Sequence, residues 1–420
     1  MLESMKDTRT FPPNDPVDGE LQVKIGQVGE QLSDAMRGVL EAIPGGPHRP
    51  QQLSRVLDIS KDLSSRTLNA SSKKDPLAVA HLMPGPASLR RLLKAASKKQ
   101  VSNELIADAE SAIHRFERLI NVDAGDRISL DGIISSWLPD ARDRFETGNK
   151  QAVYRGMAQL KGVLADVGVT TAIVHPSESG ETLDGVWILG SLGLRRIRPG
   201  PPIHFFSGHS QSSEQVKPKL TLDGQPALEL DGLMLEDYCS KPTPKVNLHR
   251  KGDSMHYMLA GVASGPASAV DVFFGEMTPG CMRRYNSPES PKLCGPSSSV
   301  TTPVATLIFD LIVHEDVYPG LEPSLRVYDT AMGGLVDIND HARDIDRLNV
   351  AESIEFLGWD VSTFRASEIP RYTKLLAHSC ERMGWDGRKF RGYRCRAQYP
   401  VYSSQMSMVF EPPTRPGSAG

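Results

Sequence analysis

Long apolar runs are absent from this chain of 420 residues. No stretch approaches the roughly 20 consecutive apolar residues that a membrane-spanning helix needs. The first twenty residues are polar, contain three prolines and lack the apolar core of a signal peptide. Apolar residues make up 39% of the chain and charged residues 24%, as in a globular protein that folds in water. We therefore expect a cytoplasmic protein that does not associate with a membrane.

Cysteine is also scarce. All five cysteines fall in the second half of the chain, and none forms a Cys-x-x-Cys pair: Cys239, Cys281, Cys294, Cys380 and Cys395. An odd number without close spacing favours buried reduced thiols over a disulfide framework. A structural zinc site needs tighter ligand pairs than these. We expect no metal and no cofactor.

Familiar catalytic motifs are missing. The sequence has neither Gly-x-Ser-x-Gly nor the phosphate-binding Gly-x-x-x-x-Gly-Lys-Ser/Thr, and the glycines at 190 and 193 are too close together for a dinucleotide loop. His314, Glu315 and Asp316 follow an expected strand, but adjacent strand residues point to opposite faces and cannot all converge. Two histidine pairs lack the spacing of helical metal ligands: His204 with His209, and His249 with His256. We expect no catalytic residue from local motifs.

Residues 53 to 68 carry the most informative pattern. Apolar residues recur at helical spacing on both sides of a short turn: Leu53, Val56 and Leu57 before it, and Leu63 and Leu68 after it. Ile59 is an apolar residue within the turn, and Ser60 is placed to cap the second helix. A pair of helices at a fixed angle can lay the second one in the major groove of DNA while the first crosses the phosphate backbone.

This segment resembles the helix-turn-helix of bacterial transcription regulators, particularly the winged-helix kind. The resemblance covers residues 50–70. Nine residues match the consensus: Leu53, Arg55, Leu57, Ile59, Ser60, Lys61, Ser65, Arg66 and Leu68. It implies that Lys61, Ser65 and Arg66 face DNA and that the region from 50 to 70 is a DNA-binding helix-turn-helix.

The segment departs from that consensus at two positions. Asp58 stands where the turn usually has Gly, which is a mild change because Asp tolerates a left-handed backbone better than most residues. Ser64 stands where the second helix usually buries a Val. A serine facing the core loses apolar burial unless Leu63 rotates inward to replace it.

Positive charge is concentrated around the same segment. From Gly46 to Lys99 there are eleven basic residues and three acidic ones, a balance of +8. The whole chain carries −3, which leaves −11 for the remainder. Clustered Lys and Arg are what binding to phosphates requires, and we expect Arg55, Lys73 and Lys74 to contact them. The alternative is a solvated helical face that contacts nothing.

Length and periodicity predict an α+β multidomain protein. A chain of this size is too long for one ordinary core. Helical periodicity fills the first part, including a long amphipathic helix over 20–43, and strand patterns begin near residue 170. We predict five segments: a disordered tail over 1–18, a helical DNA-binding region over 19–122, a helical connector running into strands over 123–210, an α+β domain over 211–411, and a second tail over 412–420.

Five expectations concern the second half. Residues 305–313 suit a central strand, 350–356 and 369–383 suit helices, and 390–410 suits a closing hairpin. Arg388 to Arg396 interleaves two aromatic residues with five cations. This segment is typical of an edge strand kept soluble by its charges, with stacking on single-stranded nucleic acid as the alternative.

Together these observations favour a sequence-specific binder of double-stranded DNA, a transcriptional regulator. Its C-terminal domain would sense an unidentified small-molecule effector, form a homo-oligomer, or do both. The long helix before residue 43 suits pairing with a second copy, because two reading helices match a palindromic site. Two alternatives stay open: an enzyme without a recognisable local motif, and a structural or partner-binding protein that never touches nucleic acid.

Overall fold

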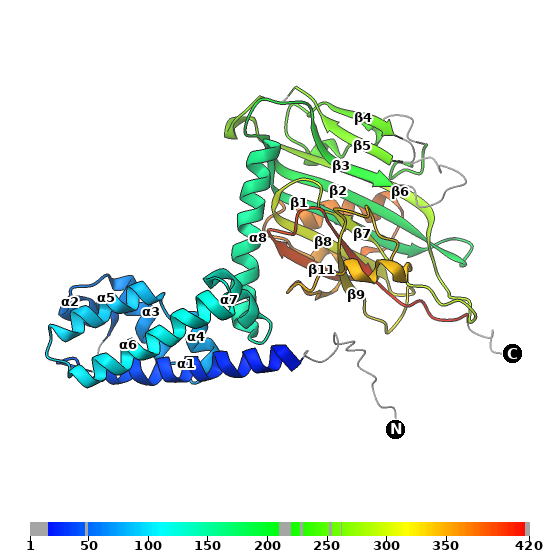
Figure 1. Ribbon diagram of the computed structural model, residues 1–420. Coiled ribbons are helices and arrows are strands. Elements are labelled where there is room, and N and C mark those ends of the chain that lie inside the picture. The colour runs from blue at the N-terminus through cyan, green and yellow to red at the C-terminus, as the bar shows by residue number, and fades with distance from the viewer. Residues whose placement is uncertain are drawn as a thin grey trace. The chain divides into compact units, whose positions relative to one another are not determined.

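A computed structural model describes residues 16–46, 49–209, 220–226, 230–251, 254–261 and 263–415. The chain forms two compact units, Met1–Glu146 and Thr147–Gly420. Helices occupy the first unit and strands dominate the second, so the predicted mixture of a helical N-terminal part and a strand-rich C-terminal half is confirmed (Figure 1). The boundary between the units falls inside the predicted connector of 123–210. Of the predicted tails, residues 1–15 and 416–420 lie outside the described residues.

The first unit is built around α1 (Pro16–Ala42). Its apolar positions recur every three or four residues and are buried, as the periodicity predicted: Ile25, Val28, Leu32, Met36 and Val39, with Ile43 after the helix end. The helix begins at Pro16, inside the segment over 1–18 that was predicted as a tail. It packs mainly against α4 (Pro76–Leu82) and α6 (Asn103–Arg118). Gly29 of α1 faces the carbonyl of Pro76, where a Cβ would collide with backbone, so the two helices contact closely there.

The other helices that precede the first strand are shorter than α1. They are α2 (Pro50–Leu57), α3 (Lys61–Ser71), α5 (Pro86–Ser97), α7 (Arg127–Ser135) and α8 (Pro139–Lys161), with a π-helical turn over Leu119–Asp123. Proline opens α2, α4 and α5 at the first helical position, where its missing N–H costs no hydrogen bond. Helix α8 ends at Lys161, because Gly162 adopts a φ of +70° and a strand begins at Val163.

The second unit contains a six-stranded sheet in the order β10-β11-β8-β1-β2-β6 (Figure 1). Its strands are β1 (Val163–Pro176), β2 (Thr182–Arg196), β6 (Val270–Arg283), β8 (Val304–His314), β10 (Glu355–Trp359) and β11 (Phe390–Gln398). Within this sheet β1 and β8 pair in parallel, and the other neighbouring strands pair antiparallel. Every residue of β8 except Ala305 is buried, which confirms the predicted central strand.

Different layers cover the two faces of this sheet. On one face Ile308 and Ile312 of β8 join a cluster with Leu375 and Leu376 of α9 (Tyr372–Arg382), the helix predicted over 369–383. On the other face the alternate residues of β8, such as Leu311, belong to a second cluster. Two three-stranded sheets supply that cluster: β7 (Ser297–Ser299), β12 (Ser404–Val409) and β9 (Ser324–Asp329), and β3 (Ile203–His209), β5 (Ser254–Leu259) and β4 (Val246–Lys251).

Several expectations for the second half are wrong. The helix predicted over 350–356 is replaced by strand β10 at 355–359. The predicted closing hairpin over 390–410 does not form, because β11 and β12 belong to different sheets. Short 3-10 helices connect the strands: Leu230–Leu233, Glu236–Tyr238, Pro266–Ser268, His341–Asp346, Val361–Thr363 and Gly387–Lys389. Among the described residues, no helix has both the length and the apolarity needed to cross a membrane. All five cysteines are free thiols, and Cys239, Cys380 and Cys395 are buried, whereas Cys281 and Cys294 are only half-buried.

The cationic strand β11 is an interior strand rather than the predicted edge strand. It lies between β10 and β8, and its residues Arg391 and Arg394 are buried. Arg394 donates two hydrogen bonds to the carboxylate of Asp310 on β8, from Nε at 2.8 Å and from Nη2 at 2.7 Å. Arg391 donates to the backbone carbonyls of Val317 and Tyr318, each at 2.9 Å. These two cations are therefore satisfied inside the fold and cannot contact nucleic acid.

Candidate nucleic-acid interface

Hydrogen bonds to Ser54 fix the turn between α2 and α3. Asp58 adopts a left-handed backbone with φ 53° and ψ 50°, so an aspartate fills the place where the consensus has glycine. The N–H of Ile59 donates to the carbonyl of Ser54, five positions earlier, at 3.1 Å, which is the 6→1 hydrogen bond of a Schellman motif. The hydroxyl of Ser54 donates in return to the carbonyl of Ile59 at 2.7 Å. The direction of the chain entering α3 is set by these contacts.

Ser60 caps the second helix, as its position predicted. Its backbone is extended, with φ −62° and ψ 144°, and its hydroxyl oxygen accepts the N–H of Leu63 at 3.2 Å. One of the free N–H groups at the helix start is thereby satisfied. Helix α3 begins at Lys61 for this reason.

The inward face of α3 explains why Ser64 is tolerated. Leu63, Ser64, Thr67 and Ala70 are all buried, so Leu63 supplies the apolar contact that Ser64 does not. The hydroxyl of Ser64 donates to the carbonyl of Ser60 at 3.2 Å, and that of Thr67 donates to the carbonyl of Leu63 at 2.8 Å. Both buried hydroxyls are satisfied within the helix and need no other partner.

The opposite face of α3 is polar and exposed. Lys61, Ser65 and Arg66, which the sequence predicted to approach DNA, are all exposed. Arg66 Nη1 lies 4.0 Å from a carboxylate oxygen of Asp62, and these side chains are 55% and 79% exposed. A contact this long between two hydrated side chains contributes little, so Arg66 can reorient toward another partner.

Two residues on this face were missed by the sequence reasoning. Asn69 follows Ser65 by four positions and is exposed, so it lies one turn further along the same side of the helix. Its amide can read adenine. Asp62 is exposed in the first turn, where a carboxylate stabilises a helix start but repels DNA phosphates. The i, i+4 spacing within the predicted helix would have identified both.

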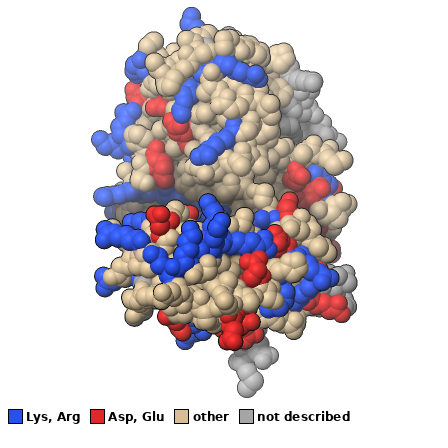
Figure 2. Space-filling view, turned by 60° about the vertical axis from the view of Figure 1, so that its left-hand side comes forward, with Lys and Arg blue, Asp and Glu red and all other residues tan. Residues whose placement is uncertain are grey.

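The flanking cations are exposed as well. Arg55 on α2 and Lys73 and Lys74 after α3 are solvent-facing and have no ion pair in the described part of the chain. Figure 2 shows Lys and Arg side chains gathered in a band on the helical unit. Arg90 on α5 differs, because it pairs with Glu110 at 2.6 Å and with Glu117 at 2.7 Å. The hydrogen bond from Arg90 to Glu117 lowers the pKa of the Glu117 carboxyl.

One feature of winged-helix proteins is not found in this unit. The described residues from Pro16 to Glu146 form helices and turns but no strand, so this part of the chain offers nothing that can serve as a β-wing. The similarity to winged-helix regulators in this unit is therefore limited to helices α2 and α3 and the turn between them.

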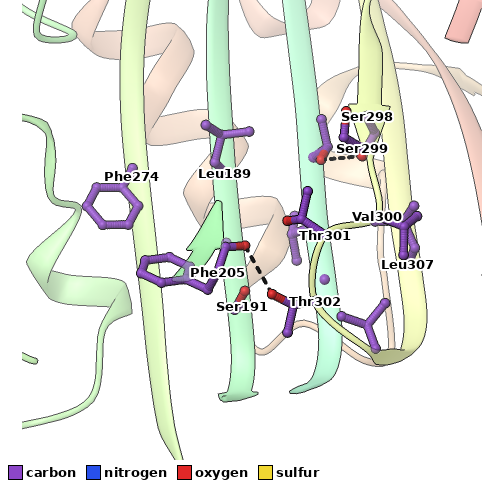
Figure 3. Close-up of a pocket in the computed structure, with 15 residues that line it drawn as sticks. Leu189, Ser191, Phe205, Phe274, Ser298, Ser299, Val300, Thr301, Thr302 and Leu307 are labelled. Atoms are coloured by element: carbon purple, nitrogen blue, oxygen red, sulfur yellow. Dashed lines mark hydrogen bonds between the residues drawn. The ribbon is translucent and has the colours of Figure 1, made fainter. Parts of the chain in front are cut away.

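The second unit contains a small pocket above the middle of the six-stranded sheet (Figure 3). Its walls include the rings of Phe205 and Phe274 and the hydroxyls of Ser298 and Thr302, and none of its lining residues is titratable. The volume is about 40 Å³. That is far below the roughly 300–1,000 Å³ of small-molecule sites, so this pocket is too small for an organic effector.

The histidines of the second unit pair differently from the sequence expectation. His314 at the end of β8 lies against His175 at the end of β1, with ring centroids 4.5 Å apart, and Glu315 turns away to pair with Lys389 at 2.9 Å. Burial and the neighbouring His175 lower the pKa of His314.

A second pair joins strands β3 and β5, with His256 Nδ1 and His204 Nε2 3.1 Å apart. The side chain of His209 lies outside the described part of the chain. His249 lies directly opposite His256 in the pairing of β4 with β5.

No family model, no curated protein and no solved structure matches this chain.

Proposed function

We propose that this chain is a sequence-specific DNA-binding protein that regulates transcription. In this proposal α2 and α3 form a helix-turn-helix, and α3 is the helix that enters the major groove. The observation that carries the proposal is the exposed polar face of α3, held in place by the left-handed turn at Asp58 and the cap at Ser60. Any surface helix exposes a polar face, and the group of cations without an ion pair in the described residues, Arg55, Lys61, Lys73 and Lys74, is the further support for a nucleic-acid partner.

The side chains divide into two roles. Arg66, Ser65 and Asn69 can reach base edges, since a guanidinium matches the two acceptors of guanine and an amide matches adenine. The remaining cations suit phosphate oxygens, which position the protein without reading sequence: Lys61, Arg55, Lys73 and Lys74. Ser60 contributes through the cap that fixes the start of α3, where its backbone also approaches the phosphates.

The test compares two substitutions on a duplex selected from a random library by the full chain. Arg66→Ala is expected to weaken the selected duplex by about 5- to 150-fold while leaving random duplex almost unchanged. Lys73→Ala is expected to weaken all duplexes alike and to reduce the salt dependence by about one unit of slope. Fluorescence anisotropy at several salt concentrations measures both.

Arg115→Ala is the matched control for Arg66. Arg115 is also an exposed helical arginine, bonded to Ser111 one turn back at 3.1 Å, but it lies on α6 outside the basic stretch. Its removal is expected to leave DNA affinity unchanged. Equal affinity of the parent chain and both test variants at low salt would remove the proposal.

We also propose that two copies of the chain associate through the second unit. β10 is the last strand of the six-stranded sheet, and its aromatic residues Phe356 and Trp359 are 51% and 48% exposed. An uncovered aromatic edge strand is a surface on which a second strand can pair, and a symmetric dimer would present two reading helices. Light scattering should give twice the chain mass, and Phe356→Lys should give the monomer. A monomeric parent chain would refute this part.

A further inference from the structure

A polar cleft lies beside the proposed reading helix, between α1 and the segment that leaves α3. Its volume is about 460 Å³, within the range of roughly 300–1,000 Å³ typical of small-molecule sites. Polar side chains form most of its wall: Glu30, Ser33, Asp34 and Arg37 of α1, and Ser71, Ser72, Lys73 and Lys74 of the α3 end. Pro76 and Val79 complete it.

Three cations surround this cleft. Lys73 and Lys74 have no ion pair within the described residues. Arg37 donates to the hydroxyl of Ser33 at 3.1 Å and lies 3.7 Å from a carboxylate oxygen of Asp34. A guanidinium has five N–H donors, so these contacts leave donors of Arg37 for another acceptor.

Ser71 adds an unsatisfied donor to the wall. It is 8% exposed, and its hydroxyl has no hydrogen-bond partner. Three neighbouring hydroxyls donate to helix carbonyls: Ser64 at 3.2 Å, Thr67 at 2.8 Å and Ser72 at 2.8 Å. A buried hydroxyl without a partner destabilises the protein. An acceptor placed in the cleft, whose wall includes Ser71, would supply the missing bond.

We propose that the cleft binds a small phosphate ester. Three cations and a hydroxyl match the charge and the several acceptor oxygens of a phosphate better than those of a carboxylate. Glu30, which also lines the cleft without an ion pair in the described residues, and Asp34 accept hydrogen bonds. The remainder of the ligand therefore carries an amino or hydroxyl group. A molecule with phosphate and ammonium groups satisfies both sides of the cleft.

Binding of this ligand regulates DNA affinity, and this part of the inference rests on the proposed function. Lys73 and Lys74 serve DNA phosphates in that proposal, and the same two ammonium groups hold the ester. The bound ester therefore competes with DNA and lowers the affinity of the protein for DNA. The ester binds the DNA-free protein better than the DNA-bound protein, and this difference is what shifts the equilibrium.

The experiment is calorimetric titration of the full chain with phosphoethanolamine, with inorganic phosphate and with ethanolamine, all without DNA. Phosphoethanolamine is expected to bind one site more tightly than inorganic phosphate, and ethanolamine is expected not to bind. The paired substitution Lys73→Ala with Lys74→Ala should weaken phosphoethanolamine by at least about tenfold, and Ser71→Ala by about three- to tenfold. Ser71→Ala should not lower the thermal stability, because it removes an unsatisfied group.

Lys98→Ala with Lys99→Ala is the matched control, since it removes the same charge from an exposed pair outside the cleft. It is expected to leave binding unchanged. Absence of saturable heat with both phosphates, or equal losses in the two lysine pairs, overturns the site. Duplex binding is measured separately on the same samples. If the ester binds and the duplex does not, the ester site stands and the proposed DNA-binding function is refuted. If the duplex binds equally well with and without the ester, only the proposed competition between the two ligands is refuted.

Discussion

The buried ion pair between Arg394 and Asp310 gives the sharpest stability prediction. The two side chains are 2% and 0% exposed, and Tyr372 donates a further hydrogen bond to Asp310 at 2.7 Å. Burial, together with the carboxylate of Asp310, raises the pKa of the Tyr372 hydroxyl well above its ordinary value, so it remains a donor. Three donors therefore converge on the carboxylate of Asp310. In Asp310→Asn the side-chain NH2 group replaces one of the two accepting oxygens, so at least one of these donors loses its acceptor.

The expected loss follows from these contacts. Breaking a buried pair leaves an uncompensated charge and costs about 3 to 5 kcal/mol. In urea this lowers the unfolding midpoint by about 1 to 2 M. Tryptophan fluorescence measures the transition of the second unit, because Trp187, Trp359 and Trp385 belong to it and only Trp137 lies in the first.

Two further variants isolate the cause. Glu315→Gln breaks the pair with Lys389, whose side chains are both about half exposed, and is expected to cost at most about 0.5 kcal/mol. Replacing Asp310 and Arg394 together by Leu and Met should recover part of the loss of Asp310→Leu alone, because no charge is then left buried. If Asp310→Asn changes the free energy of unfolding by less than about 1 kcal/mol, the reasoning from burial is wrong.

Three other predictions follow from single residues. Asp58→Gly should stabilise the helical unit by about 0.5 kcal/mol and leave DNA affinity intact. Glycine removes the steric strain of an aspartate at a φ of 53°, and the entropic cost of glycine is smaller than that strain; a lower melting temperature would contradict this. Asp62→Asn should raise DNA affinity by about threefold at low salt by removing a carboxylate from the exposed face of α3, and anisotropy that shows weaker binding would count against that face. The lowered pKa of His314 means that the unfolded chain binds more protons, so stability should fall as the pH drops from 7.5 toward 5; urea midpoints of His314→Asn should show a weaker dependence, and an unchanged dependence would exclude His314 as its source.

Much of the fold follows from periodicity, and the errors have physical causes. The stripe of α1 and the apolar run of β8 were predictable because each element contributes a single continuous face to a core. The helix predicted over 350–356 was wrong because no local pattern shows that strand β11 has an edge on which β10 can pair. The hairpin over 390–410 failed because pairing between sheets depends on segments far apart in sequence, as when β12 pairs with β9.

The candidate site was predictable to a similar degree. The turn and the cap are local, so Asp58 and Ser60 could be placed from sequence. The face of α3 also follows from helical spacing, although Asn69 was overlooked. The cleft could not be predicted, because it joins Arg37 to Lys73 and Ser71 across a contact between helices that lie far apart in the chain.

Positive charge in the sequence has two different outcomes in this chain, and the availability of partners decides between them. Arg391 and Arg394 on β11 face carbonyls and a carboxylate that the sheet brings to them, so their charge is used within the fold. Lys61, Lys73 and Lys74 receive no such partner in the described residues. Cations that a protein leaves unpaired on one unit, beside a rigidly positioned helix, can lower their free energy by binding an anion from outside. A count of charges therefore locates candidate sites, and the pairing of each charge determines which candidate is available to a ligand.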